Sequence, residues 1–311
     1  MPVKDKAKKL LRFLTSPDYR FLVLAARGRK GSVPAEAFLK RMYRIHMGRE
    51  LHLKDPQTYT EKLQWLKLYD HRPEYTVMVD KYAVKNYVSK KIGPEYVIPL
   101  LGVWDKVEDI DFDSLPKQFV LKTTHDSGGI VVCKDKEKLD MVKAKKQLRY
   151  FLNRNYYDRN REWPYKHVPH RILAERYMED PRQGELRDYK FFTFGGVPKV
   201  LYIAQGRGLG GETVADFFDM DFQHLPFTID HKMAPVPPEK PKNFEKMKQL
   251  AAILSEGTPQ LRVDFYEVDG KIYFGEMTFF HCSGMEAFHP GKWDQIFGSW
   301  VELPPVSPED L

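Results

Sequence analysis

Hydrophobic and polar positions alternate along several stretches of the chain, and this alternation predicts strands. In the clearest of them, two runs of β-branched and aromatic residues flank Asp269-Gly270, a pair typical of β-hairpin turns. Residues 186–194 alternate charged and aromatic side chains, turn at Gly195-Gly196 and return as a second hairpin. Further strands are predicted at 118–122, 130–133 and 170–178.

Apolar residues recur at helical spacing in other stretches. Thr58 and Glu61 have the spacing of a capping box, which predicts a helix through Tyr69. Further helices are predicted from about Thr76 to Lys90, from Asp140, and after Asn243 as an N-cap. The segment 205–242 is rich in Gly, Pro and Asp, and we expect it to loop over a site.

Composition narrows the class of protein. A chain of 311 residues with 42% hydrophobic and 14% aromatic content is not disordered. Its net charge of +7 fits anionic partners such as nucleotides, charged glycans or a lipid surface, but is too small to predict nucleic-acid binding. Two cysteines support no disulfide framework, and we found neither a secretory signal nor an apolar run of about 20 residues. We therefore predict a cytoplasmic protein.

The first 30 residues combine lysines and arginines with leucines and phenylalanines. Such a basic amphipathic segment forms either a helix packed on its own domain or a helix lying on an anionic membrane surface. The second alternative would place the protein peripherally on the inner face of the membrane.

Arg262, Asp264 and Glu276 interrupt the apolar strands of the first hairpin. Buried carboxylates need a counter-ion, and Mg²⁺ takes carboxylate oxygens together with phosphate oxygens. The alternative is an amphipathic hairpin with a solvated acidic face. A two-residue turn would put Asp264 and Glu276 on opposite faces. We therefore predict a three-residue loop, Val268-Asp269-Gly270, or an equivalent bulge, with Gly270 at positive φ and both carboxylates converging on one cleft.

A second group of candidates surrounds the strand that ends in Lys122. The glycine-rich turn that follows it is typical of a flap whose backbone N–H groups approach phosphate oxygens, although a hairpin turn without ligand is also common. Arg207 has small neighbours and is free to bind a carboxylate or phosphate. Asp80-Lys81, His125 and His281 fit either ligand contacts or ordinary polar positions.

The order of these features resembles the ATP-grasp superfamily, and more closely its TupA-like family of teichuronopeptide and capsular polysaccharide biosynthesis. The resemblance extends over about residues 45–300. It rests on the blocks TYTEKLQWLKLYD, DKYAVKNYV, IPLLGVWD, FVLKTTHDSGG, NYYDRNREWPYK, ILAERYMED, LRDYKFFTFGG and DFFDMDF.

The resemblance implies an α+β fold of the ATP-grasp type, in which two α+β lobes clamp ATP, with a mainly helical N-terminal region. ATP and Mg²⁺ are the implied cofactors. The implied ATP-binding residues are Lys122, Thr124, Asp126, Ser127, Gly128, Gly129, Glu175, Tyr177, Asp188 and Lys190. The implied catalytic residues are Lys122, Arg262 and Arg207, and the implied metal ligands are Asp264, Glu276 and Thr278, the last at a position where the superfamily usually has asparagine.

We expect five segments along the chain. These are an N-terminal helical region at 1–75, a pre-ATP-grasp α/β segment at 76–117, one ATP-grasp lobe with the flap at 118–180, the C-terminal lobe with the metal site at 181–303, and a tail at 304–311.

The implied activity is that of a carboxylate–amine ligase. ATP would phosphorylate a carboxylate, and an amine would displace phosphate from the acyl phosphate, which leaves ADP. The expected partners are an amino acid or other amine and a glycan, or its precursor, that contains uronic acid. Two alternatives are a glycosyltransferase of polysaccharide biosynthesis and a nucleotide-binding protein with impaired catalysis.

Overall fold

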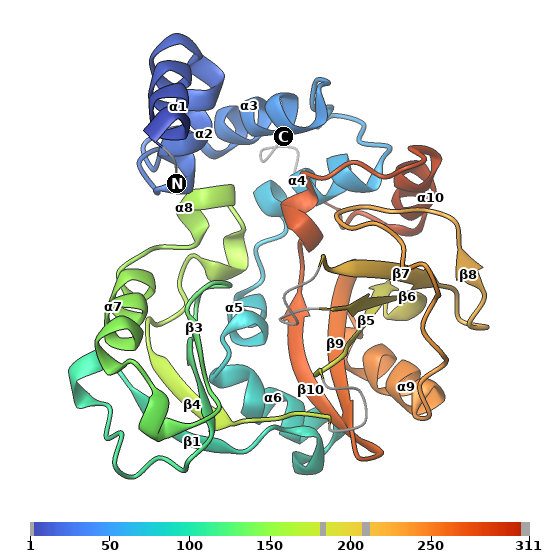
Figure 1. Cartoon of the computed structure of the whole chain (residues 1–311). Coiled ribbons are helices and arrows are strands. Elements are labelled where there is room, and N and C mark those ends of the chain that lie inside the picture. The colour runs from blue at the N-terminus through green and yellow to red at the C-terminus, as the bar shows by residue number, and fades with distance from the viewer. Residues whose placement is uncertain (1–2, 181–184, 207–211, 306–311) are drawn as a thin grey trace.

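Two antiparallel β-sheets form the framework of the protein, which is described here from a computed structural model. The structure describes residues 3–180, 185–206 and 212–305. In Figure 1 one sheet lies on the left and the other on the right, with α5 and α6 between them. The first sheet has the strand order β1-β4-β2-β3. Its strands are β1 (Leu100–Trp104), β2 (Phe119–Thr123), β3 (Ile130–Cys133) and β4 (Ile172–Arg176).

The second sheet contains six strands in the order β10-β9-β5-β6-β7-β8. They are β5 (Asp188–Phe194), β6 (Val197–Gln205), β7 (Val214–Phe218), β8 (His224–Leu225), β9 (Gln260–Val268) and β10 (Lys271–Thr278). Both predicted hairpins are confirmed, as β5–β6 and β9–β10. The prediction of a loop over 205–242 is wrong in part. β7 is largely buried and pairs with β6, so this segment extends the sheet before it loops.

Helices precede the first sheet. They are α1 (Val3–Thr15), α2 (Pro17–Ala26), α3 (Ala35–Met47), α4 (Tyr59–Tyr69), α5 (Pro73–Val79) and α6 (Ala83–Ile92). The capping box of Thr58 and Glu61 is confirmed at the start of α4. The single helix predicted from Thr76 to Lys90 is wrong. The chain leaves the helix at Asp80, whose carboxylate accepts from the backbone N–H of Tyr82 and pairs with Arg171 at 2.8 Å.

The remaining helices are α7 (Met141–Leu152), α8 (Tyr157–Asn160), α9 (Phe244–Ser255) and α10 (Lys292–Trp300). Five short 3-10 turns are η1 (Pro94–Tyr96), η2 (Val107–Asp109), η3 (Lys136–Lys138), η4 (Trp163–Tyr165) and η5 (His281–Gly284). Asp140 caps α7 as predicted. Asn243 precedes α9, but its side chain makes no cap bond there. Its amide instead donates to Glu267 and to the carbonyl of Gly270, which fixes α9 against the turn of the β9–β10 hairpin.

Each sheet has its own apolar core. The larger core joins the second sheet to α3, α4, α9 and α10, while a smaller one lies between the first sheet and α7. A third, small cluster of Ile98, Met178 and Val268 lies where the two sheets approach each other. There a β-bridge joins Val97 to Phe274. The sheets are therefore connected at one end.

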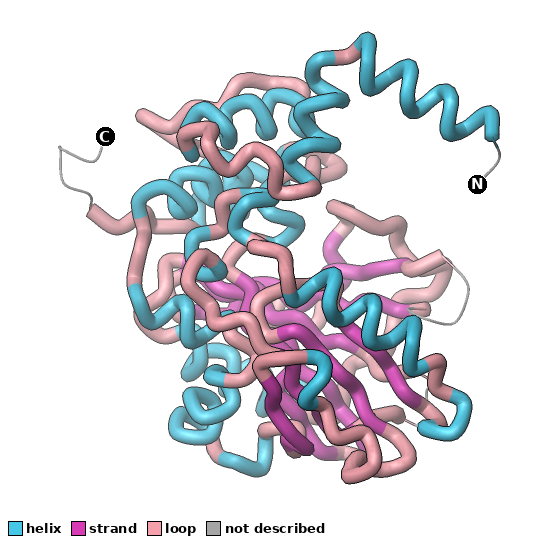
Figure 2. The backbone as a smooth tube through the Cα atoms, turned by 90° about the vertical axis from the view of Figure 1, so that its left-hand side faces the viewer, coloured by secondary structure: helices cyan, strands magenta, loops and turns pink. Residues whose placement is uncertain are grey.

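The N-terminal helix does not bury its leucines. Leu10, Leu11 and Leu14 are 60%, 63% and 63% exposed. Figure 2 shows α1 extending away from the body of the molecule. The expectation that this segment packs its apolar side chains on its own domain is therefore wrong for these three residues. None of the helices in the described ranges has the length and apolar composition that a bilayer crossing requires.

Candidate active site

The β9–β10 hairpin brings its charged residues to one face by means of a bulge. The turn is formed by two residues, Asp269 and Gly270, with φ of 51° and 74°, so the predicted three-residue loop is wrong and the positive φ of Gly270 is confirmed. The pairing then shifts between Phe274 and Glu276. Gly275 is the extra residue, and a Cβ there would lie 3.2 Å from the carbonyl oxygen of Asp264. The equivalent bulge that the sequence allowed is therefore confirmed.

After the bulge, Glu276 lies opposite Asp264 and Thr278 opposite Arg262. Directly paired residues share a face, so all four side chains point the same way. Arg262 Nη2 donates to Asp264 Oδ2 at 2.8 Å, to Glu276 Oε1 at 3.0 Å and to Thr278 Oγ1 at 3.0 Å. Its Nε donates to Asp264 Oδ1 at 2.7 Å. The guanidinium and both carboxylates thus lie on one face, as predicted, and the two carboxylates share one guanidinium nitrogen.

Lys190 completes this group from β5. It lies opposite Asp264, to which its ammonium donates a short hydrogen bond, and it also lies 3.4 Å from Asp188 Oδ2. Burial would raise the pKa of Asp264, but Arg262 and Lys190 more than offset it and lower that pKa below its ordinary value. Asp264 is therefore a buried carboxylate that stays ionised because two cations hold it.

The chemistry of these side chains fits a hard divalent cation. Asp264, Glu276 and Thr278 offer only oxygen donors, the kind that Mg²⁺ prefers. Glu276 is 44% exposed on its side chain, so one of its oxygens can reach a ligand while Arg262 holds the other. Thr278 supplies a neutral hydroxyl, which leaves room in the shell for water and phosphate oxygens.

A second charged group lies on the first sheet. Glu175 of β4 lies opposite Val120, next to the strand-end Lys122, and it bonds two ammonium groups. The distances from its carboxylate oxygens are 2.5 Å to Lys85 Nζ and 2.6 Å to Lys122 Nζ. Burial alone would raise the pKa of Glu175, but Lys122 and Lys85 lower it to about 2. Lys85 lies on α6 and was not predicted, although it belongs to the block DKYAVKNYV.

Lys81 connects this group to the flap. Its ammonium donates to the carbonyl oxygen of Asp126 at 2.5 Å, and its backbone N–H donates to the carbonyl oxygen of Thr124. Burial lowers the pKa of Lys81, and Glu276 is the strongest of the charges that raise it. A lysine left open as an ordinary helix residue thus lies between the flap and the carboxylates of the second sheet.

The flap residues divide into buried and exposed ones. Thr124 and Asp126 are buried, whereas Ser127 and Gly128 are exposed. Asp126 Oδ1 accepts from the N–H of Gly128, and its Oδ2 is buried with no hydrogen-bond partner among the described residues. A Cβ at Gly128 would meet Phe151, and one at Gly129 would meet Thr123. Close packing therefore requires both glycines, and neither has a positive φ.

Other predicted residues lie around the junction of the sheets. Asp188 is buried beside Lys190, and Tyr177 is half-buried with its hydroxyl donating to Glu179 at 3.0 Å. The apolar cluster of Ile98, Met178 and Val268 lies at this junction. Arg207 lies outside the described residues.

The two histidines left open by the sequence have different surroundings. His125 stacks on His170 with ring centroids 3.6 Å apart and bonds the carbonyl of Arg154, so it has a structural role. Burial, followed by His170, lowers the pKa of His125 to about 4. His281 is buried, and its Nδ1 lies 2.7 Å from Nη1 of Arg262. It therefore belongs to the site.

Two buried charged residues near Ser283, Lys67 of α4 and Glu162 just before η4, were not predicted from the sequence. Lys67 donates to Ser283 Oγ at 2.8 Å and to Ser283 O at 2.7 Å, and burial lowers its pKa to about 8. Burial raises the pKa of Glu162, while Lys67 and Ser283 lower it in part. Periodicity could not reveal this pair, because both residues look like exposed positions of short helices. Their blocks TYTEKLQWLKLYD and NYYDRNREWPYK were the available signal.

The chain matches a protein-family model and is similar to several solved structures. A family model described as TupA-like ATPgrasp matches residues 61–302. The chain is similar in structure to D-alanine–D-alanine ligase from Bacillus anthracis complexed with ATP, with a TM-score of 0.41 and 15% identity over 65% of this chain and 55% of that one. For D-alanine–D-alanine ligase from Helicobacter pylori the TM-score is 0.42 and the identity 14%, over 78% of this chain and 69% of that one.

The ATP-grasp ligase PsnB, complexed with minimal precursor, Mg and ADP, gives a TM-score of 0.38 and 9% identity over 71% of this chain and 57% of that one. The chain spans little more than half the length of the ligase from Bacillus anthracis complexed with ATP. No curated protein matches the sequence.

Proposed function

The chain belongs to the TupA-like ATP-grasp family, and from this premise we propose that it is an ATP- and Mg²⁺-dependent ligase that joins a carboxylate to an amine. The observation that carries the proposal is the convergence of Asp264 and Glu276 on one nitrogen of Arg262. Two carboxylates and a guanidinium on one face, together with Lys122 and Lys81 beside the flap, suit a metal-bound polyphosphate.

Each lobe would contribute to ATP binding. Lys122 and Lys81 at the flap supply positive charge for the phosphates, and Arg262 supplies it from the second sheet. The adenine would lie against the cluster of Ile98, Met178 and Val268, where the two sheets join. Bound Mg²⁺, held by Asp264, Glu276 and Thr278, would neutralise phosphate charge.

The reaction would proceed in two steps without a covalent enzyme intermediate. A carboxylate oxygen of the substrate attacks the γ-phosphorus, the bond to the β-phosphate oxygen breaks, and ADP leaves. The amine nitrogen then attacks the carbonyl carbon of the acyl phosphate, phosphate leaves, and the amine loses a proton. The contribution of the chain is to position the reactants, neutralise charge and exclude water beneath the flap.

The substrates we propose are an amino acid or other amine and a uronic-acid-containing glycan or its precursor. Support comes from the resemblance to proteins of teichuronopeptide and capsular polysaccharide biosynthesis, and from the net charge of +7, which suits an anionic glycan.

A product assay tests the reaction class. We expect ADP and phosphate, each equimolar with the amide, when Mg²⁺, ATP, a uronic-acid glycan and an amino acid are all present, and no ADP above background when either acceptor is omitted. Coupled ADP release across an amino-acid panel, followed by mass spectrometry, measures this. Stoichiometric AMP, or consumption of a nucleotide sugar in place of ATP, would contradict the proposal.

We also propose that α1 binds anionic membranes, which a lipid-linked acceptor would favour. The helix exposes Leu10, Leu11 and Leu14 beside basic side chains. Each lysine or arginine near such a surface contributes about 1 kcal/mol and is screened by salt. We expect the full chain to sediment with vesicles that contain phosphatidylglycerol at low salt, and a variant with Leu10→Ser, Leu11→Ser and Leu14→Ser to remain in solution. Equal sedimentation of both proteins would reject this role.

A further inference from the structure

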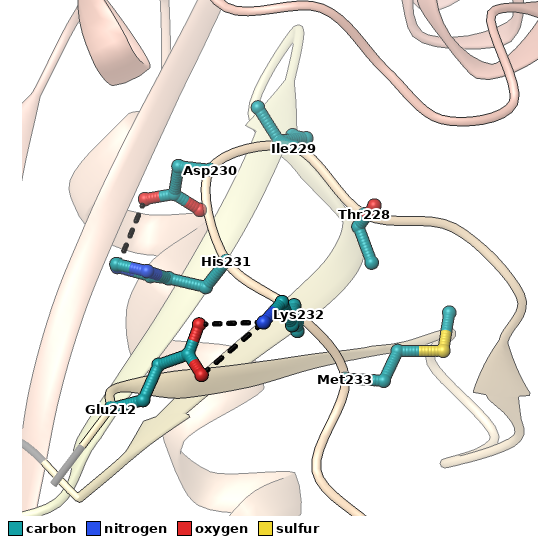
Figure 3. Close-up of a pocket in the computed structure, with 7 residues that line it drawn as sticks. All are labelled: Glu212, Thr228, Ile229, Asp230, His231, Lys232 and Met233. Atoms are coloured by element: carbon teal, nitrogen blue, oxygen red, sulfur yellow. Dashed lines mark hydrogen bonds and ion pairs between the residues drawn. The ribbon is translucent and has the colours of Figure 1, made fainter.

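A pocket of about 490 Å³ lies beside the candidate active site, in the segment that follows β8 (Figure 3). It is lined by Glu212, Thr228, Ile229, Asp230, His231, Lys232 and Met233. Two of these residues carry carboxylates. Glu212 is paired with Lys232 at 3.0 Å, so its charge is already compensated.

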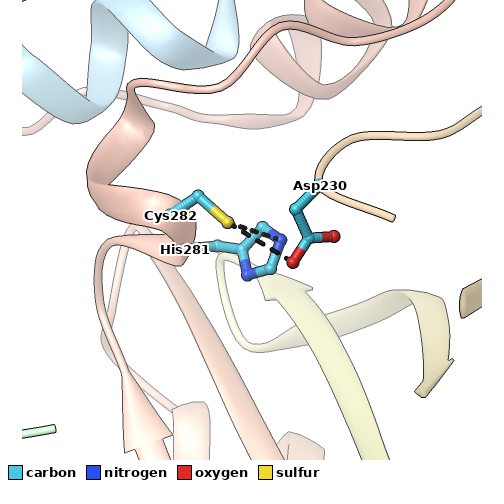
Figure 4. Close-up of side chains that lie close together, drawn as sticks. All are labelled: Asp230, His281 and Cys282. Atoms are coloured by element: carbon cyan, nitrogen blue, oxygen red, sulfur yellow. Dashed lines mark hydrogen bonds between the residues drawn. The ribbon is translucent and has the colours of Figure 1, made fainter. Parts of the chain in front are cut away.

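Asp230 has a different environment. Its side chain is 22% exposed, and in the described part of the chain no lysine or arginine pairs with it. The Tyr202 hydroxyl donates to its oxygens at 3.2 and 3.4 Å, and Cys282 Sγ donates at 3.7 Å (Figure 4). His231 Nε2 lies 3.5 Å away. The hydroxyl of Tyr202 and the thiol of Cys282, neither of them a cation, therefore fix this carboxylate in place.

His281 connects Asp230 to the candidate active site. Arg262 can only donate hydrogen bonds, so His281 Nδ1 accepts from its Nη1 and the ring proton lies on Nε2. Burial, followed by Arg262, lowers the pKa of His281 to about 3, so the ring is neutral. Nε2 lies 3.5 Å from Cys282 Sγ, which in turn contacts Asp230. The pocket therefore adjoins the residue proposed to bind phosphate.

The backbone of η5 keeps these groups in place. Cys282 and Ser283 have φ of 46° and 56°, in the left-handed region that non-glycine residues rarely adopt. Lys67 fixes this turn through its two hydrogen bonds to Ser283. Strained backbone of this kind is retained where the surrounding structure determines it, and it concentrates at ligand sites.

The cluster of Asp230, His281 and Cys282 also has the spacing of a metal site. Two features argue against a metal here. The proton on Nε2 of His281 blocks coordination by that nitrogen, and Nδ1 is taken by Arg262. Burial, followed by Asp230, raises the pKa of the Cys282 thiol well above its ordinary value, so the thiolate that a metal requires is disfavoured.

We propose that Asp230 binds the ammonium group of the amine co-substrate in this pocket, an inference that rests on the proposed ligase function. A site that uses the cations Lys81, Lys122 and Arg262 repels a cationic amine unless a carboxylate offsets the repulsion. Asp230 is such a carboxylate, with no lysine or arginine partner in the described ranges and close to Arg262 through His281. Tyr202 orients its oxygens for the ligand.

Titration calorimetry of the full chain without nucleotide tests this site. The probes are methylamine, putrescine, L-lysine and glucosamine. We expect at least one of them to bind the wild type, and Asp230→Asn to weaken that binding about 10- to 100-fold, because a hydrogen bond to a charged group is lost. Glu212→Gln, in the same pocket but already paired, should change the affinity less than about twofold, since exposed pairs contribute little. Tyr202→Phe keeps the carboxylate but removes a donor that orients it, so it should weaken binding less than Asp230→Asn does.

Equal affinity for Asp230→Asn and the wild type, or no binding of any probe to the wild type, would overturn the proposal. Zn²⁺ binding that Asp230→Asn abolishes would also overturn it in favour of a metal site. The same proteins in the ADP-release assay separate the two proposals. Amine binding that depends on Asp230 without ADP formation would leave this site standing and reject the ligase, whereas ligation unaffected by Asp230→Asn would reject the site alone.

Discussion

Replacing Glu276 by glutamine should lower turnover about 10²- to 10³-fold, the effect of removing one well-placed electrostatic group from an active site. Glu276 is partly exposed, and Arg262 is its only ion-pair partner among the described residues, so the amide should fit without disturbing the hairpin. Nucleotide binding should persist, because Lys122 and Lys81 beside the flap remain.

The measurement is ADP release as a function of Mg²⁺ concentration, with thermal unfolding in parallel. A lost metal ligand should be compensated in part by raising Mg²⁺, which a purely structural role would not produce. Glu267→Gln, on the same hairpin, is the matched control and should keep full turnover. Unchanged turnover for Glu276→Gln at every Mg²⁺ concentration would remove Glu276 from the metal site.

Asp264→Asn should destabilise the protein by about 3–5 kcal/mol, because removing one partner leaves buried cations uncompensated. Arg262 and Lys190 would both lose the charge that they share. Asp294 is the matched control, a buried carboxylate bonded to Thr60 and Arg49. Burial raises the pKa of Asp294, so its ionised form gains less from the fold and Asp294→Asn should cost less. Urea unfolding at pH 7 measures both, and equal losses would contradict the charge argument.

The pH dependence of unfolding gives a second test of this prediction. The pKa of Asp264 is lowered in the folded protein, so the stability that its charge contributes is present above the ordinary carboxyl pKa of about 3.9 and is lost as the pH falls through the folded value. The difference in unfolding free energy between wild type and Asp264→Asn should therefore shrink in acid. A difference that stays constant down to pH 2 would show that Asp264 acts through packing alone.

Local patterns predicted the elements whose signals are local. The capping box at Thr58, the hairpin around Asp269-Gly270 and the helix start at Asp140 all appear where chemistry within four residues specifies them, although the length of the turn was predicted wrongly. The helix break at Asp80 was missed because apolar spacing continues across it, and the break depends on Arg171, a partner 91 residues away. Distant ion pairs leave no periodic signal.

The candidate site shows the same division. Arg262, Asp264 and Glu276 stood out because charges are unexpected in apolar strands. Lys85 and Lys67 lie on helices, where lysines are common, and only the fold shows that each is turned inward onto a carboxylate or a strained turn. Asp230 was missed for a similar reason, because nothing nearby in the sequence distinguishes it from other acidic residues of a long loop.

The bulge at Gly275 also bears on how this hairpin can change in length. A turn with one more residue and a strand without Gly275 would again place Asp264 opposite Glu276, because the odd residue would then lie in the turn. The same segment closed by a two-residue turn without a bulge would pair Asp264 with Gly275 and send Glu276 to the other face. The carboxylates therefore require that the odd residue between them stays outside the paired ladder, either in the turn or in a bulge. Relatives with longer turns should be aligned by strand pairing, not by residue count, before their acidic residues are compared.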